Sequence, residues 1–199
     1  DAPWGYWYFD DITGAMKHGL TEISNGNGGT KKVYYDDTTG LMLYGEHVIN
    51  DRLYYFDIYD GTAIDGWYKI DGVMYWYENG ERQGYHVNDT SYRGKEIYDP
   101  LTNAWYWLDS VQKGTFATSK DVYLPTNTAE YIKDEAAYGM DPSKWKWVRY
   151  DDYGHMIKGW NTNANGTYYF DLITGAMAKG NVTIDGVTYH FDETSGVLQ

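Results

Sequence analysis

Residues 168–180 read Tyr168-Tyr169-Phe170-Asp171-Leu172-Ile173-Thr174-Gly175-Ala176-Met177-Ala178-Lys179-Gly180. The pattern is an aromatic run closed by an acid, a turn glycine, and a second glycine five residues later. A short unit that recurs along a chain cannot bury its apolar face alone and must stack on its neighbours. Related aromatic runs stand at Trp7–Asp10, Tyr34–Asp36, Tyr54–Asp57, Tyr75–Glu78, Trp105–Asp109 and Tyr189–Asp192.

The spacing of the repeats is regular. The closing aromatics Tyr35, Phe56 and Tyr77 follow one another at intervals of 21 residues. The interval from Leu108 to Tyr150 is 42 residues, which is the length of two units. This regularity indicates successive copies of one structural unit, with a degenerate or inserted copy inside the long interval.

Glycine positions suggest how each unit folds. The first glycine, as in Thr13-Gly14, suits a tight turn because glycine adopts positive φ without steric cost. We expect a short strand after it, such as residues 15–18, which ends at the second glycine. Dipeptides such as Asp71-Gly72 then turn the chain into the next aromatic strand. Each unit is therefore predicted to be a β-hairpin with a connector.

The sequence thus predicts an all-β solenoid of stacked β-hairpin repeats of about 20 residues, with one irregular insertion. Residues 127–138 are a candidate helix capped by Thr128. We expect one continuous module with N-terminal hairpin repeats at 1–113, an insertion or degenerate repeat at 114–144, and C-terminal hairpin repeats at 145–199.

Composition narrows the classes of partner. The chain carries 23 Tyr and 9 Trp, no Cys and a net charge of -13. Nucleic acids and anionic membrane surfaces are poor partners for so acidic a chain. The sequence has no apolar run long enough for a membrane span, and membrane insertion is not expected. Asp1 does not open a signal peptide, so we expect a boundary within a longer protein, upstream of which a catalytic domain could lie.

Catalytic and metal-binding patterns are absent from the sequence. Acid pairs such as Asp10-Asp11 and Asp151-Asp152 stand at strand ends, where they suit turn capping better than acid–base chemistry. The five histidines stand singly, without the spacing of metal ligands. The sequence therefore predicts a non-catalytic module with no cofactor and no metal site.

The repeats resemble the cell-wall-binding repeat family, which comprises choline-binding modules of bacterial surface proteins and the related glucan-binding repeats. The family phrase joins Gly-Trp to an aromatic run, a turn glycine, Met and Gly-Trp again. It is matched at Gly66–Gly72, Tyr153–Trp160 and Thr174–Gly180. The resemblance covers nearly the whole chain except 114–144, and it implies a hairpin solenoid on a secreted or bacterial cell-surface protein.

The resemblance also implies ligand-binding residues. In its choline-binding branch, an aromatic cage combines the Trp of Gly-Trp, the first Trp of the aromatic run, and an aromatic residue or Met of a neighbouring hairpin. The most complete set here is Trp147, Met156 and Trp160, closed by Tyr168 or Tyr169. A poorer set consists of Trp67, Met74 and Tyr75. Trp105 and Trp107 are added because one face of their strand could be exposed.

Three functions remain open at this point. The first is attachment of a surface or secreted protein to a cell-wall polymer or other glycan, with choline as one candidate ligand, through aromatic platforms. The second is an adhesin that binds host glycan or protein. The third is an α-glucan-binding accessory domain of a secreted enzyme whose chemistry lies upstream.

Overall fold

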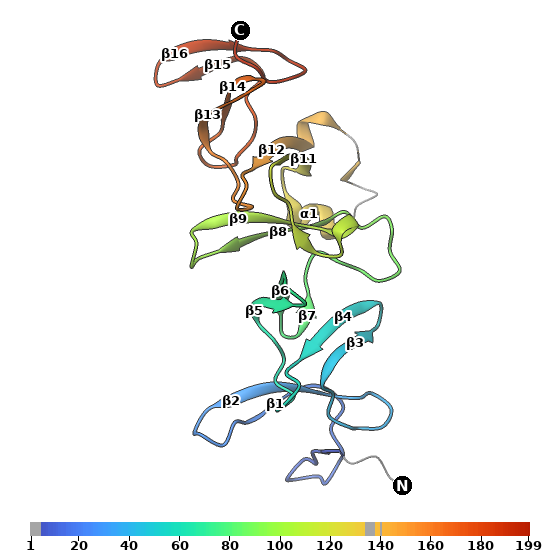
Figure 1. Cartoon of the computed structure of the whole chain (residues 1–199). Coiled ribbons are helices and arrows are strands. Elements are labelled where there is room, and N and C mark those ends of the chain that lie inside the picture. Colours follow the sequence, from blue (N-terminus) through green and yellow to red (C-terminus); the bar gives the residue numbers. More distant parts are fainter. Residues whose placement is uncertain (1–4, 134–137, 140) are drawn as a thin grey trace. The chain divides into compact units, whose positions relative to one another are not determined.

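The computed structural model describes residues 5–133, 138–139 and 141–199, and these residues are nearly all in β-strands and turns (Figure 1). The strands are β1 (Gly19–Ser24), β2 (Thr30–Tyr35), β3 (Gly45–Ile49), β4 (Arg52–Phe56), β5 (Gly66–Ile70), β6 (Val73–Glu78), β7 (Glu81–Arg82), β8 (Gly94–Asp99), β9 (Ala104–Asp109), β10 (Thr115–Phe116), β11 (Lys120–Pro125), β12 (Trp145–Tyr150), β13 (Gly159–Asn163), β14 (Gly166–Phe170), β15 (Gly180–Ile184) and β16 (Val187–Phe191). The helical segments are α1 (Thr128–Lys133) and two short 3₁₀ turns, η1 (Ser110–Gln112) and η2 (Pro142–Lys144).

The predicted hairpins are confirmed. Antiparallel pairs join β1 to β2, β3 to β4, β5 to β6, β13 to β14 and β15 to β16. The two-residue turn at Asp71-Gly72 has positive φ at both positions, 49° and 84°. That conformation matches the twist of the flanking strands, which is why such dipeptides mark hairpins.

The role expected of the second glycine is wrong. Gly19, Gly45 and Gly66 each begin a strand rather than end one. The segment at 15–18 is not a strand, and it contributes a single bridge between Met16 and Phe9. The physical reason is the positive φ of the second glycine, 73° at Gly19, which redirects the chain between the bridge and the hairpin.

Turn capping is confirmed for the first acid of each pair, Asp10, Asp36 and Asp151. Asp36 Oδ1 accepts from the backbone N–H of Thr39 at 2.6 Å and from the Thr39 hydroxyl at 2.8 Å. Asp171 makes the same pair of bonds with Thr174, at 2.7 and 2.8 Å. Because a carboxylate that accepts such bonds is favoured in its charged form, the pKa values of Asp36 and Asp171 are lowered.

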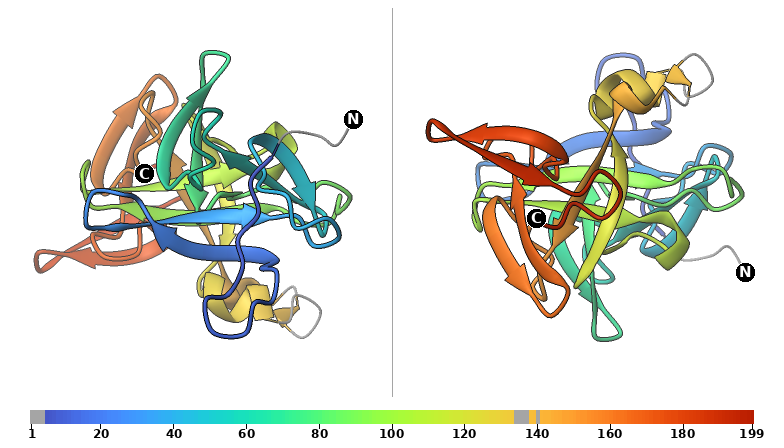
Figure 2. Two further views of the ribbon diagram at one scale, coloured as in Figure 1. Left: turned by 90° about the horizontal axis from the view of Figure 1, so that it is seen from below. Right: turned by 90° about the horizontal axis from the view of Figure 1, so that it is seen from above.

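The described residues fall into two compact units. The first comprises the residues up to Lys95 together with Leu108–Phe116, and the second comprises Glu96–Trp107 together with Ala117–Gln199. In the second unit, the hairpins β13–β14 and β15–β16 point in different directions (Figure 2). Successive hairpins therefore rotate relative to each other, and this rotation decides which side chains meet. The three-part division expected from the sequence stays a prediction.

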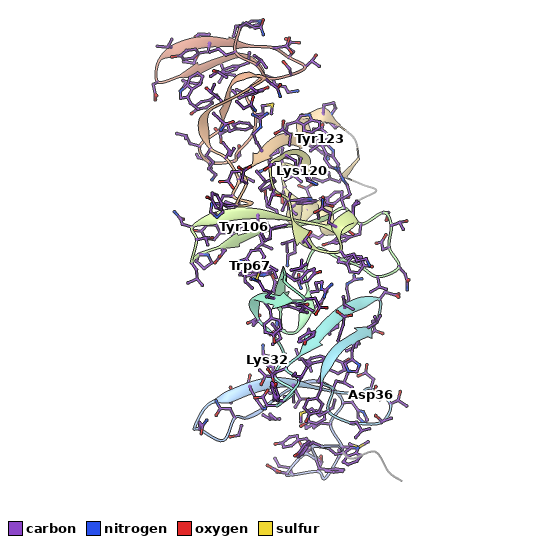
Figure 3. All side chains as sticks on the ribbon, viewed as in Figure 1. Lys32, Asp36, Trp67, Tyr106, Lys120 and Tyr123 are labelled. Carbon is purple, nitrogen blue, oxygen red and sulfur yellow. The ribbon has the colours of Figure 1, made fainter. Side chains whose placement is uncertain are left out.

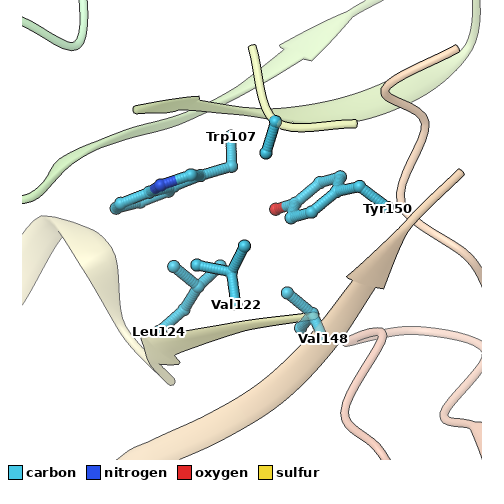
Figure 4. Packing of buried hydrophobic residues seen from close by; sticks show 6 residues of the cluster. Trp107, Val122, Leu124, Val148 and Tyr150 are labelled. Atoms are coloured by element: carbon cyan, nitrogen blue, oxygen red, sulfur yellow. The ribbon is translucent and has the colours of Figure 1, made fainter. Parts of the chain in front are cut away.

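Each unit has its own apolar core. In the first, Tyr34, Phe56 and Ala63 form a buried cluster. In the second, Leu124 and Val148 are fully buried beside Trp107, Val122 and Tyr150 (Figure 4). Truncating a fully buried Leu to Ala costs about 2–5 kcal/mol of stability. These cores fix the positions of the turns around them.

The insertion contains the first strand of another hairpin. β11 pairs with β12 over the whole length of both strands, and residues 126–144 connect them. The candidate helix is present as α1, but its cap is Asn127 rather than Thr128, because Asn127 Oδ1 accepts from the N–H of Glu130 at 3.1 Å. Residues 134–137 of the candidate helix lie outside the described residues.

Candidate ligand-binding sites

A backbone hydrogen bond recurs between neighbouring repeats. The N–H of Met42 donates to the carbonyl of Tyr6 at 2.9 Å, and the N–H of Met156 donates to the carbonyl of Trp105 at 2.9 Å. The N–H of Met177 donates to the carbonyl of Trp147 at 2.8 Å. Each bond ties the residue three positions before the closing residue of a run (Phe9, Leu108 or Tyr150) to the residue two positions after the turn glycine of the following repeat.

A pocket of about 450 Å³ lies at the first of these links, and we call it the tyrosine pocket. Its lining residues are Gly5, Tyr6, Tyr44, Ile58 and Tyr59. Tyr6 directly precedes the run Trp7–Asp10, Tyr44 lies two residues after Met42 of the second repeat, and Ile58 and Tyr59 belong to the turn of the third. Tyr6 and Tyr59 are 69% and 86% exposed, so their rings are available to a ligand.

A smaller pocket of about 170 Å³ lies at the second link, and we call it the tryptophan pocket. Its lining residues are Glu96, Trp105, Thr126, Lys146, Met156, Ile173 and Thr174. Trp105 begins one aromatic run, Met156 follows the turn glycine of the next repeat, and Ile173 lies in the turn of the one after. The two pockets therefore occupy equivalent positions in the repeat, and three successive repeats build each of them.

Charged groups distinguish the tryptophan pocket. Lys146 Nζ lies 3.8 Å from Glu96 Oε1 and donates to the Thr174 carbonyl at 2.7 Å. Burial raises the pKa of the Glu96 carboxyl, while the nearby Lys146 ammonium opposes that shift. The side chains of Lys146 and Glu96 are only 10% and 12% exposed. This pocket thus already contains a cation from the chain itself.

The position equivalent to Tyr6 in the following repeat is occupied by Lys32, on β2 (Figure 3). Its carbonyl accepts the expected bond from the N–H of Ala63, at 2.7 Å. Its ammonium reaches the side chain of Asn79 in the turn of the third repeat, at 2.6 Å. A lysine here bridges the space that an aromatic residue lines in the tyrosine pocket.

The structure distributes the most complete predicted set over three places. Met156 is tied to Trp105 and packs against the core cluster that includes Trp107. Trp147 is 40% exposed, and its ring lies 5.0 Å from that of Tyr123. The methionine tied to Trp147 is Met177, one repeat further along the chain.

Trp160 forms a separate aromatic cluster. Its ring lies 5.1 Å from Tyr169, which is directly opposite on β14, and 5.0 Å from Tyr189 of the next hairpin. Trp160 itself is 44% exposed. Tyr168 lies on the other face of β14, where it is buried, and the guanidinium of Arg149 stands 4.1 Å above its ring.

The second predicted set is also divided between the two faces of a strand. Trp67 (Figure 3) packs edge-on against Trp76 at 5.1 Å and Phe116 at 5.4 Å. Tyr75 has its ring covered by the guanidinium of Arg82, at 3.9 Å. Adjacent residues on a strand point to opposite faces, so Tyr75 cannot join Trp67.

The remaining predicted residues differ in burial. Met74 is half-buried and lies opposite Lys69 in the β5–β6 hairpin. Trp105 is 37% exposed and lies 5.3 Å from Tyr98, whereas Trp107 is buried in the core cluster. Trp107 therefore presents no ring face to a ligand.

Tyr44, Tyr59, Glu96 and Lys146 were not among the residues predicted from the sequence. A sequence signal for the pocket positions exists: each pocket combines the residue three positions before the end of one run, a residue two to four positions after the turn glycine of the following repeat, and the turn of the repeat after that. Reading three consecutive repeats, instead of two, finds both pockets.

In the described part of the chain, no group of three or more His, Asp or Glu side chains could hold a metal ion. The same residues include no helix that is both long and apolar enough to cross a membrane.

The fold and these sites define a class: modules of stacked β-hairpin repeats with aromatic pockets between the repeats. The family model described as the choline-binding repeat matches residues 158–198. Glucosyltransferase-S of Streptococcus mutans serotype c is 25% identical over an alignment 216 positions long. The alignment covers 95% of this chain and 14% of that protein. Glucosyltransferase-S of Streptococcus downei is 25% identical over an alignment 219 positions long, which covers 94% of this chain and 15% of that protein.

Solved structures share the fold. Choline-binding protein F of Streptococcus pneumoniae aligns with a TM-score of 0.60 and 20% identity, over 97% of this chain and 55% of that one. The modular autolysin LytC of the same organism, in complex with a synthetic peptidoglycan ligand, aligns with a TM-score of 0.57 and 22% identity, over 98% and 36%. The predicted resemblance to choline-binding and glucan-binding repeat modules is confirmed, as is the hairpin-repeat fold.

Proposed function

We propose that this chain is a non-catalytic module that binds a neutral glucan through the tyrosine and tryptophan pockets. The observation that carries the proposal is the equivalence of the two pockets, each built from three successive repeats with aromatic side chains at the rim. Pyranose rings stack their apolar C–H faces on flat aromatic side chains, and tyrosine adds a hydroxyl for hydrogen bonding. Two such pockets on one chain suit a polymer, because linked sites raise avidity by about 10²–10⁴.

Internal cations favour a neutral ligand over a cationic one. Arg82 stands over Tyr75, Arg149 stands over Tyr168, and Lys146 lies inside the tryptophan pocket. A guanidinium or ammonium over a ring makes the same interaction that a quaternary ammonium would make. Because the chain supplies these cations itself, a choline group would have to compete with them at Tyr75, at Tyr168 and in the tryptophan pocket.

The relatives support the same reading of the ligand. Both are named glucosyltransferases, and this chain spans about 14–15% of their length. We therefore place the module in a larger secreted or surface-attached bacterial protein, where it would hold the remainder of that protein against glucan. The acids Asp36 and Asp171 at its strand ends cap turns, which is a structural role.

Choline on a cell-wall polymer is the second candidate. It is favoured by the match of residues 158–198 to the choline-binding repeat and by the exposed ring of Trp160 beside Tyr169 and Tyr189. Three rings at about 0.5–2 kcal/mol each would give a millimolar site.

Retention on insoluble polymers tests the proposal. The purified chain should be retained on cross-linked dextran and eluted by soluble dextran, while choline at about 100 mM, far above a millimolar site, should leave it bound. Retention only on choline-substituted resin, with elution by choline, would replace the proposal by the second candidate. Retention on neither would reject both.

A further inference from the structure

A polar groove of about 520 Å³ lies in the second unit and shares no residue with the tryptophan pocket. It runs between the start of β11, the end of β12, the turn at residues 151–153 and the β13–β14 hairpin. Its size falls within the range of about 300–1,000 Å³ that is typical of small-molecule sites. The groove therefore has room for a ligand, and its chemistry indicates which kind.

Arg149, Asp121 and Asp151 of the groove already have partners within the chain. Arg149 binds Asp121 through two hydrogen bonds, of 2.6 and 2.9 Å, and donates to Asn161 Oδ1 at 3.2 Å. Asp151 Oδ1 accepts from the backbone N–H groups of Tyr153 and His155, at 2.8 Å each. An anionic ligand would have to compete with Asp121 for Arg149, so the groove is poorly suited to one.

Uncommitted polar groups line the rest of the groove. In the part of the chain that the structure describes, the side-chain N–H groups of Asn161 and Asn163 donate to no protein acceptor, and the Tyr153 hydroxyl has no protein partner. Tyr153 is 74% exposed and stacks against His155 with ring centroids 6.1 Å apart. Asp152 accepts from the Ser119 hydroxyl and retains further acceptor capacity.

Amide donors, carboxylate acceptors and an exposed ring form a set that recognises hydroxyl groups on a flat, neutral ring. Amides and carboxylates can satisfy two adjacent hydroxyls at once, and the tyrosine ring provides a surface for the C–H face. Neither the tyrosine pocket nor the tryptophan pocket offers such a group of amides.

We propose that this polar groove is an additional saccharide subsite, in which Asn161, Asn163 and Asp152 bind the hydroxyls of a neutral pyranose and Tyr153 stacks on its ring. This inference rests on the proposed function and adds to it a site that recognises hydroxyls rather than aromatic stacking alone.

Nuclear magnetic resonance of the full chain with isomaltohexaose, the six-unit α-1,6 oligosaccharide of dextran, tests the subsite directly. The side-chain amide signals of Asn161 and Asn163 should shift on titration. Asn163→Ala should weaken the binding reported by the Asn161 amide about 5-fold, the effect of losing one ordinary hydrogen bond. Tyr153→Ala should weaken it further. Asn181→Ala, on the neighbouring hairpin and outside the groove, is the matched control and should leave the titration unchanged.

The outcomes separate the two proposals. If the chain binds dextran but the side-chain amide signals of Asn161 and Asn163 do not shift, the subsite is overturned and the proposed function stands. If the chain binds neither dextran nor isomaltohexaose, both the proposed function and the subsite are rejected. Shifts produced by choline but not by the oligosaccharide would also overturn the subsite, because the ligand would then be a cation.

Discussion

The tyrosine pocket and the tryptophan pocket occupy the same position in the repeat but contain different chemistry. Tyr6 and Trp105 stand at equivalent positions, each tied by its carbonyl to a methionine of the next repeat. The first pocket is lined by aromatic and aliphatic residues, whereas the second also contains the Glu96–Lys146 ion pair. The backbone of the repeat therefore fixes where a pocket forms, and individual side chains decide what can enter it.

Removing an aromatic wall from the open pocket should have the largest effect on binding. We expect Tyr59→Ala to weaken the affinity of the tyrosine pocket for isomaltohexaose by about 30-fold, since truncating a central aromatic contact costs about 2 kcal/mol. Calorimetric titration measures this change. Leu101→Ala, which removes a side chain that is 92% exposed outside both pockets, is the control and should bind as the unmodified chain does. Equal affinity for the two variants would exclude Tyr59 from the site.

Converting the tryptophan pocket toward a cation site should have the next largest effect. Lys146→Met leaves the Glu96 carboxylate without its ion-pair partner, and we expect a loss of about 2 kcal/mol in unfolding free energy. Choline should then raise the melting temperature of the variant but not of the unmodified chain, because the internal ammonium has been removed.

The double variant Lys146→Met/Glu96→Gln is the matched control. It should recover most of the lost stability and should not respond to choline, because no charge remains in the pocket. A choline response in the unmodified chain as large as that of Lys146→Met would contradict the internal-cation account.

Removing the lysine at the position equivalent to Tyr6 should have a smaller effect. Lys32→Ala removes the bond to Asn79, which is a surface contact, and should cost less than about 1 kcal/mol in unfolding free energy. Chemical denaturation measures this value. A loss of several kcal/mol would mean that Lys32 supports the fold and does more than bridge the pocket position.

Lowering the pH should destabilise the turns that line both pockets. Near neutral pH this effect should be smallest, because the turn carboxylates are charged there. The pKa of Asp60 is lowered chiefly by its hydrogen bond with the Thr62 side chain, and that of Asp171 by the backbone N–H of Thr174. A folded-state pKa below the unfolded value gives stability that is present above the ordinary Asp range and is lost as the pH falls through the lowered value. Melting temperature against pH should therefore decline below about pH 4. Asp171→Asn should show a shallower acid decline, and an unchanged slope would disprove the contribution of this turn.

The hairpins could be predicted because their signals are local. The aromatic run, the acid and the Asp-Gly dipeptides specify a strand, a cap and a turn within about 20 residues. The β11–β12 hairpin was harder to predict, since residues 126–144 separate its two strands. No local signal indicated that 120–125 pairs with 145–150.

The binding residues could be predicted only in part, because they depend on the rotation between successive hairpins. Trp105 and Met156 were both predicted, yet in separate sets, and the structure unites them with Lys146 and Glu96. The sequence grouped Trp147 with Met156, but the backbone N–H that bonds to the Trp147 carbonyl belongs to Met177, one repeat further along the chain. Sequence distance alone does not give the angle at which one hairpin follows the next.

Retention of the double variant Tyr59→Ala/Trp105→Ala on cross-linked dextran tests the central claim most directly. Both side chains are exposed at the rims of their pockets, so the variant should keep its circular dichroism spectrum and its melting temperature within a few degrees. We predict that this folded variant passes through the dextran column without retention. Retention equal to that of the unmodified chain would contradict the assignment of glucan binding to pockets built from three successive repeats.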